Sequence, residues 1–82
     1  MIVEHKVKEI LLEILDVKEE EIVPQASLID DLRANSIDLV EIFTAFENTF
    51  DLEINDAQAS KLKNVQDAVD FLKAKINQKR VE

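Results

Sequence analysis

Several residue types that build common functional sites are missing or rare in this sequence of 82 residues. There is no cysteine, which excludes disulfides, thiolate metal sites and cysteine nucleophiles. There is no glycine, which excludes a glycine-rich phosphate loop, and one histidine is too few for a histidine-rich zinc site. No apolar run approaches the roughly 20 residues that span a membrane, and the N-terminus lacks the apolar segment of a signal peptide. We therefore expect a single small domain over residues 1–82 that is soluble and cytoplasmic.

Negative charge is concentrated in the middle third of the chain. The formal net charge is −8, and the range from Asp30 to Asp56 holds eight acids and one base, a sum of −7. This balance argues against nucleic acid as a partner, because binding to phosphates needs clustered lysine and arginine. It favours basic protein partners, since long-range attraction steers the two surfaces together. A solvated acidic surface without a partner is the alternative for such a charge run.

The spacing of apolar residues predicts helices and no strands. A long connection over residues 17–35 contains the only proline, and its scattered apolar side chains indicate that it is pinned to the core. We expect the polar tail, residues 77–82, to fray. The fold class is therefore all-α, a small four-helix bundle with three longer helices and one short one. The predicted helices cover residues 2–15, 36–50, 56–61 and 64–76.

Short polar side chains stand where three of these helices begin. Asn35 or Ser36 can cap the helix over residues 36–50, because such a side chain accepts bonds from free backbone N–H groups. Asp56 is the expected cap of the short helix. Asn64, with Asp67 three residues later, resembles a capping box for the last helix.

The predicted helix over residues 36–50 carries two apolar stripes. One stripe falls within a narrow arc and forms the core face. The second, made of Ile37, Val40 and Thr44, is milder and lies among acidic side chains. An apolar centre with a charged surround is typical of a protein-docking surface, although this stripe could instead cover the long connection. The core stripe consists of Leu39, Ile42, Phe43, Phe46 and Phe50.

Few side chains in this sequence have the neighbouring groups that catalysis requires. A nucleophile needs a base beside it, and the only imidazole, His5, lies on the polar face of the first predicted helix. Asp30 and Asp31 lie in an open acidic segment and match no EF-hand spacing, so we expect no metal site. A phosphodiester on the Ser36 hydroxyl would lie at the positive end of a helix. The residues permit this modification without requiring it.

Residues 31–38 read Asp-Leu-Arg-Ala-Asn-Ser-Ile-Asp. This segment resembles the phosphopantetheine attachment site of acyl carrier proteins, whose pattern is Asp-Leu-Gly-Ala-Asp-Ser-Leu-Asp. The motif alone is weak evidence, but further segments resemble the family in the same order and spacing, over nearly the whole chain. These further segments are residues 15–22, 45–54 and 65–72.

The resemblance implies a carrier that is not itself an enzyme. A phosphopantetheinyl transferase would attach 4′-phosphopantetheine to Ser36, and its thiol would carry acyl thioesters in the synthesis of fatty acids or related lipids and polyketides. The acyl chain would be able to enter the bundle, where Phe43, Phe46 and Phe50 would fill part of the space. The carrier would be a monomer that meets basic patches on acyl-transferring and chain-modifying enzymes, without membrane or nucleic-acid partners. Its docking residues would be Ile37, Asp38, Val40, Glu41, Thr44 and Glu47.

Two other interpretations remain open. The cargo could be a polyketide, an aminoacyl group or a hydroxyacyl chain instead of a fatty-acyl chain. The chain could also be an unmodified interaction module that has the carrier fold and acts only by docking. The change Ser36→Ala separates this module from a carrier, because a pure docking module would lose nothing.

Three residues near Ser36 depart from the family pattern. Ile37 stands in place of Leu and keeps the docking chemistry. Asn35 removes an acid that partner enzymes could read, and Arg33 stands in place of Gly and puts a positive charge within the acidic patch. Both changes could narrow the set of partners, so one hypothesis is a specialised carrier, and the alternative is the housekeeping carrier of fatty acid synthesis.

We expect the paired change Asn35→Asp and Arg33→Gly to improve loading by a transferase of the fatty-acid type. The expected gain follows from restoring one acid and removing one base next to Ser36. The rate of mass gain in the presence of coenzyme A measures it. An unchanged rate would contradict the interpretation of a specialised carrier.

Overall fold

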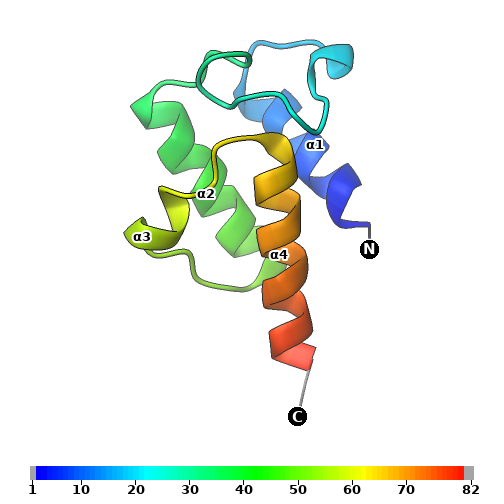
Figure 1. Cartoon of the computed structure of the whole chain (residues 1–82), viewed down its shortest axis with the longest axis vertical. Coiled ribbons are helices and arrows are strands. Elements are labelled where there is room, and N and C mark those ends of the chain that lie inside the picture. Colours follow the sequence, from blue (N-terminus) through cyan, green and yellow to red (C-terminus); the bar gives the residue numbers. More distant parts are fainter. Residues whose placement is uncertain (1, 81–82) are drawn as a thin grey trace.

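The computed structural model describes residues 2–80 and contains four α-helices and one 3₁₀-helix within that range. Three α-helices are long and one is short, which confirms the predicted all-α architecture. The helices are α1 (Val3–Ile14), η1 (Glu19–Glu21), α2 (Ser36–Phe50), α3 (Asp56–Ala59) and α4 (Val65–Arg80) (Figure 1).

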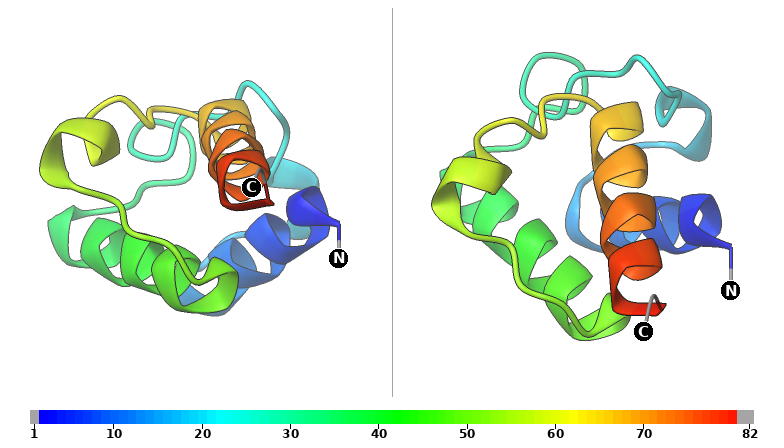
Figure 2. Two further views of the ribbon diagram at one scale, coloured as in Figure 1. Left: turned by 90° about the horizontal axis from the view of Figure 1, so that it is seen from below. Right: turned by 60° about the horizontal axis from the view of Figure 1, so that its bottom comes forward.

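The helices surround one core in an irregular bundle. α1 packs against both α2 and α4. Seen from below, α1 and α4 lie on one side, α2 and α3 lie on the other, and α3 is diagonally opposite α1 (Figure 2). The long connection between α1 and α2 crosses one end of the bundle, at the top of Figure 1. The N-terminus of α2 therefore lies at the end of the molecule that this connection covers.

The core is built from one apolar face of each long helix. Val7 and Leu11 lie one turn apart on α1, as do Ile42 and Phe46 on α2, because residues four apart share a helix face. Together with Leu72 of α4 they are completely buried. Burying a large apolar side chain stabilises the fold by about 1.5–3 kcal/mol. This face of α2 is thereby committed to the core, and its other face is left for solvent.

The connection between α1 and α2 is pinned to the core, as its apolar residues predict. Leu28 and Leu32 are each 1% exposed. The Leu28 N–H donates to the Lys63 carbonyl oxygen at 3.0 Å, and the Val65 N–H donates to that of Ala26 at 3.0 Å. These bonds tie the connection to the start of α4. Ile22, Ala26 and Ala34 of the connection also belong to the core.

The prediction for α3 is wrong in two details. Asn55, and not Asp56, caps the helix: its side-chain oxygen accepts the Gln58 N–H at 2.8 Å, and the Gln58 side chain accepts the Asn55 N–H at 3.0 Å. The helix ends at Ala59 and not at Lys61. It ends there because the Lys61 N–H bonds to the carbonyl three residues back, as in a 3₁₀ turn.

α4 begins as predicted and ends later than predicted. The Asp67 N–H donates to the Asn64 side chain at 2.8 Å, and the Asn64 N–H donates to the Asp67 carboxylate at 3.1 Å, so the capping box is present. Residues 77–80, expected to fray, continue the helix to Arg80. Lysine, glutamine and arginine are good helix formers, so this part of the sequence is compatible with a continued helix. Residues 81–82 of the expected tail lie outside the described residues.

Because Leu32 is buried, Leu32→Ala should lower the free energy of unfolding by about 2–4 kcal/mol, through lost burial and a residual cavity. Ile29 lies in the same connection but is 59% exposed, so Ile29→Ala should change it by less than about 0.5 kcal/mol. Urea unfolding of both variants measures the difference. Equal effects would show that the connection is not anchored through Leu32.

Candidate functional site

Ser36 is the first residue of α2 and is exposed. The cap is Asn35: its side-chain oxygen accepts the Asp38 N–H at 2.8 Å, and the Asp38 carboxylate accepts the Asn35 N–H at 3.1 Å. The sequence left open whether Asn35 or Ser36 caps the helix, and the structure decides for Asn35. The Ser36 hydroxyl is therefore not needed to begin the helix and faces solvent beside it.

The position of Ser36 fits a phosphodiester. The N–H groups of Ser36 and Ile37 have no partner within the helix, because the carbonyl groups they would meet lie before its first turn. They contribute to the positive end of the helix dipole, which favours an anion. The Asp38 carboxylate opposes that attraction, but it is oriented by its bond to the Asn35 N–H. An anionic linkage here needs no burial of charge and no rearrangement of the cap.

The second stripe of α2 faces solvent. Ile37 is 71% exposed and Val40 is 65% exposed, and Thr44 and Glu41 are exposed as well. These residues therefore do not cover the long connection, which was the alternative explanation for the stripe. The stripe begins one residue after Ser36 and continues along the same helix, so a protein docked on it would lie next to the Ser36 hydroxyl.

Two acids of the predicted docking surface also hold the local backbone. Asp38 completes the cap of α2, and both it and Glu47 are half-buried. A Glu47 carboxylate oxygen accepts the N–H of Ile54 at 2.8 Å, which ties the segment after α2 to the helix. Both carboxylates thus have a structural contact, and their electrostatic role in docking stays a prediction.

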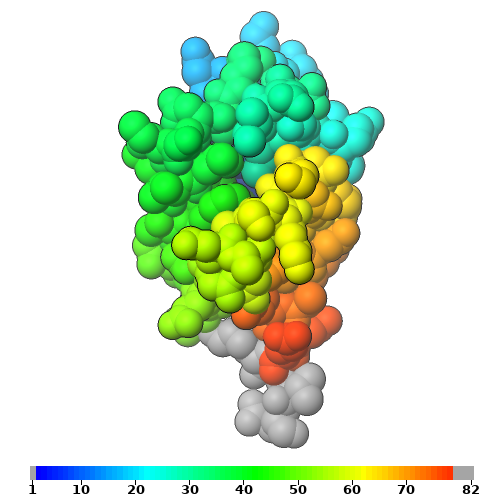
Figure 3. Space-filling model, turned by 60° about the vertical axis from the view of Figure 1, so that its left-hand side comes forward, coloured from blue at the N-terminus to red at the C-terminus, as the bar shows by residue number. Residues whose placement is uncertain are grey.

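A cavity of about 260 Å³ lies between α2, the α3 region and the connection that precedes Ser36. In the space-filling view, the connection, α2 and α3 meet around a small hollow on this face (Figure 3). Leu39 and Phe43 of the core stripe are half-buried and line the cavity. The sequence did not predict that the connection, the end of α3 and the segment after it also line the cavity, because irregular segments carry no periodic signal. These other lining residues are Ser27, Leu28, Ile29, Asp30, Ala59, Ser60, Leu62 and Lys63.

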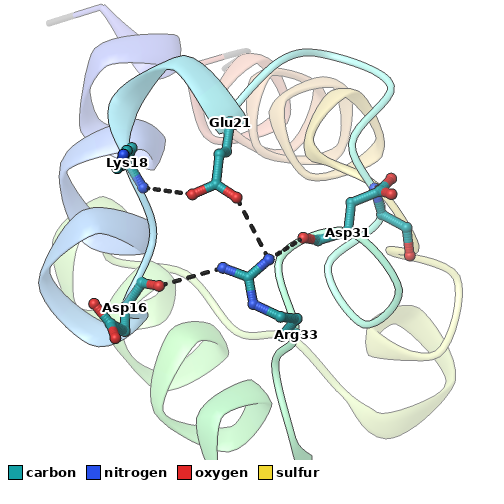
Figure 4. A network of polar contacts seen from close by, with 6 residues as sticks. Asp16, Lys18, Glu21, Asp31 and Arg33 are labelled. Atoms are coloured by element: carbon teal, nitrogen blue, oxygen red, sulfur yellow. Dashed lines mark hydrogen bonds and ion pairs between the residues drawn. The ribbon is translucent and has the colours of Figure 1, made fainter.

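Arg33 lies three residues before Ser36 in a left-handed conformation, with φ of 61°. Such a backbone costs about 1–2 kcal/mol for a residue with a Cβ, whereas glycine adopts it freely. Its guanidinium points away from α2, toward Glu21 and the backbone of Asp16 (Figure 4). The sequence placed its charge within the acidic range from Asp30 to Asp56, but the structure pairs it with an acid outside that range.

Glu21 is held from two sides. Its Oε2 accepts the Lys18 N–H at 2.8 Å, and its Oε1 lies 3.4 Å from Nη1 of Arg33. The Lys18 N–H bond, and after it the Arg33 charge, hold the pKa of the Glu21 carboxyl below its ordinary value. Glu21 is therefore ionised near neutral pH and remains a partner for Arg33.

The other residues considered for chemistry remain unremarkable in their surroundings. His5 is exposed on α1. Asp31 has a structural contact, because its carboxylate accepts the Ser27 N–H at 2.7 Å. The part of the chain that the structure describes contains no group of three or more residues suited to hold a metal ion. Over the same part, no helix is both long and apolar enough to cross a membrane.

Comparison with known proteins agrees with this geometry. Residues 5–72 match the family described as a phosphopantetheine attachment site. The acyl carrier protein of Buchnera aphidicola subsp. Acyrthosiphon pisum (strain Tuc7) is 47% identical over 73 residues, which cover 89% of this chain and 91% of that protein. The acyl carrier protein of strain APS of the same bacterium has the same identity and coverage. The chain belongs to the acyl carrier protein family and carries acyl groups on phosphopantetheine.

Proposed function

We propose that Ser36 is the attachment residue and that the carrier serves fatty acid synthesis or a related lipid or polyketide pathway. The observation that carries the proposal is an exposed serine at the first position of α2, with the cap supplied by its neighbour Asn35. A transferase would join Ser36 Oγ to the phosphate of coenzyme A, with loss of the hydroxyl proton and departure of adenosine 3′,5′-bisphosphate. The bound cofactor supplies a thiol for thioester chemistry, which suits a chain without cysteine.

The protein's own residues would present this group and would catalyse nothing. The first turn of α2 would hold the linkage through its N–H groups and dipole. Asp38, Glu41 and Glu47 would steer the carrier toward basic patches on partner enzymes, and Ile37, Val40 and Thr44 would form the apolar contact. Such a small contact favours weak and brief binding, which suits a monomeric carrier that visits several enzymes.

The cavity beside α2 would receive part of an acyl chain. Leu39 and Phe43 supply apolar walls on α2, and Leu28 and Leu62 supply them from the connection and from the segment after α3. Phe43 lies against Phe46, with 6.2 Å between the ring centroids. Because Phe46 is completely buried, Phe43 has firm support on its inner side. The aromatic ring of Phe43 would therefore bound the space available to a chain.

Incubation with coenzyme A and a broad-specificity phosphopantetheinyl transferase should add one phosphopantetheine to the protein. Ser36→Ala should abolish this gain, because the acceptor oxygen is lost. Ser60→Ala, which removes another exposed serine, should leave the gain unchanged. Intact mass spectrometry measures all three proteins, with a known carrier in the same tube as a positive control. Loading that persists in Ser36→Ala would refute Ser36 as the site, and no loading beside a modified control would favour a dedicated transferase or an unmodified docking module.

Glu41→Lys should lower kcat/KM for loading by roughly three- to tenfold, because charge reversal at a docking rim slows the encounter with a basic partner. The deficit should shrink as ionic strength rises, since exposed charges are screened. Glu13→Lys makes the same change in net charge at an exposed position on α1. Steady-state kinetics of both variants measures the effect. An equal loss in both would mean that total charge, and not the α2 surface, is recognised.

A further inference from the structure

The unusual feature of the segment before Ser36 is an arginine in a left-handed conformation. Arg33 has φ of 61°, a backbone state that glycine adopts without steric conflict. A residue held in such a conformation is maintained by its surroundings and is a reason to look for a function. The contacts of the Arg33 side chain are therefore expected to maintain this conformation.

The guanidinium of Arg33 joins three segments of the chain. Nη1 lies 3.4 Å from Oε1 of Glu21 in η1 and donates to the carbonyl oxygen of Asp31 at 3.0 Å. Nη2 donates to the carbonyl oxygen of Asp16, just after α1, at 3.4 Å. Figure 4 shows these contacts converging on one side chain. We call this set of contacts, formed by Arg33 with Glu21, Asp16 and Asp31, the Arg33 clasp.

The clasp holds one end of the short segment over residues 33–35, and the cap of α2 fixes the other end. Between Arg33 and the cap residue Asn35 lies Ala34, which is buried and whose N–H donates to the Leu28 carbonyl oxygen at 2.9 Å. The Asn35 side chain then begins α2 and sets the position of Ser36. Movement of the segment away from the end of α1 must therefore break the clasp, strain the cap, or both.

We propose that Arg33 is a positioning residue that ties the segment carrying Ser36 to η1 and to the end of α1, so that the attachment site is in place before modification. This inference rests on the proposed attachment at Ser36. The matching geometry of Glu21 supports it, because its second oxygen is anchored by the Lys18 N–H. The clasp also differs from a charge that partner enzymes read directly, since the guanidinium is directed at the protein's own backbone.

Variants of both partners test the proposal. Arg33→Gln keeps a residue with a Cβ at the left-handed position, and it shortens the side chain and removes the guanidinium with its charge. Glu21→Gln removes the partner charge and keeps an acceptor for the Lys18 N–H. Glu19→Gln is the matched control, because Glu19 lies in the same 3₁₀-helix and pairs with Lys8 of α1 at 3.6 Å. It removes the same charge without touching the clasp.

Amide hydrogen exchange on the full-length unmodified chain is the first readout. Protection of the Leu32 and Ala34 amides, both bonded within the connection, should fall roughly two- to fivefold in Arg33→Gln and Glu21→Gln, the range expected for an exposed ion pair. The Glu19→Gln control should retain wild-type protection at these amides. Unchanged protection in both clasp variants would overturn the proposal. This readout needs no loading, so it stands even if Ser36 is not the attachment residue.

The kinetics of loading with coenzyme A and the transferase form the second readout. A loosened segment lowers the fraction of molecules ready to bind, so KM should rise in both clasp variants, by up to about fivefold, with kcat unchanged. If the transferase instead reads charge directly, Arg33→Gln should lower KM while Glu21→Gln and Glu19→Gln raise it. Opposite movements of KM would overturn the proposal. This proposal divides the effect of the paired change on loading. Asn35→Asp should improve loading, whereas Arg33→Gly removes the clasp and should weaken it.

Discussion

The reciprocal bond between Asn35 and Asp38 is the interaction on which the functional end of the molecule depends. It begins α2, and it does so with the side chain before Ser36 and not with that of Ser36 itself. A capping serine would have its oxygen directed at backbone N–H groups. Because Asn35 takes that role, the hydroxyl beside it stays exposed at the positive end of the helix. The cap therefore creates both the start of α2 and the accessibility that a covalent attachment needs.

The two faces of α2 differ in exposure: one is buried in the core, and the other carries the proposed docking stripe. Ile42 and Phe46 are completely buried and fix the helix against the rest of the core. Ile37 and Val40 are exposed, although their side chains are as apolar as those of the core. Exposure of apolar groups is unfavourable unless a partner covers them for part of the time. On the proposed function, a contact of this size with charges around it would give recognition without long residence, which suits a carrier that leaves each enzyme in turn.

Much of the fold could be predicted from the sequence, because helical periodicity is a strong local signal. The bounds of α2 and the capping box of α4 agree with the prediction. The cap of α3 was missed because Asp56 and Asn55 are both good caps, and only the backbone shows which side chain reaches an N–H. The role of Arg33 was missed for a related reason. A sequence gives its charge, but its left-handed backbone and its contacts with Glu21 depend on segments that only the fold brings together.

The position of Arg33 also affects how the net charge of the range from Asp30 to Asp56 is distributed over the surface. Its guanidinium is the single base between Asp30 and Asp56, yet it pairs with Glu21 and lies away from the α2 surface. The acids on α2 are therefore less neutralised than the sum over that range indicates. Asp38 and Glu47 accept backbone N–H bonds in addition to carrying charge. An amide in either place would keep an oxygen for the backbone but lose the attraction for a basic partner, so only a carboxylate meets both requirements.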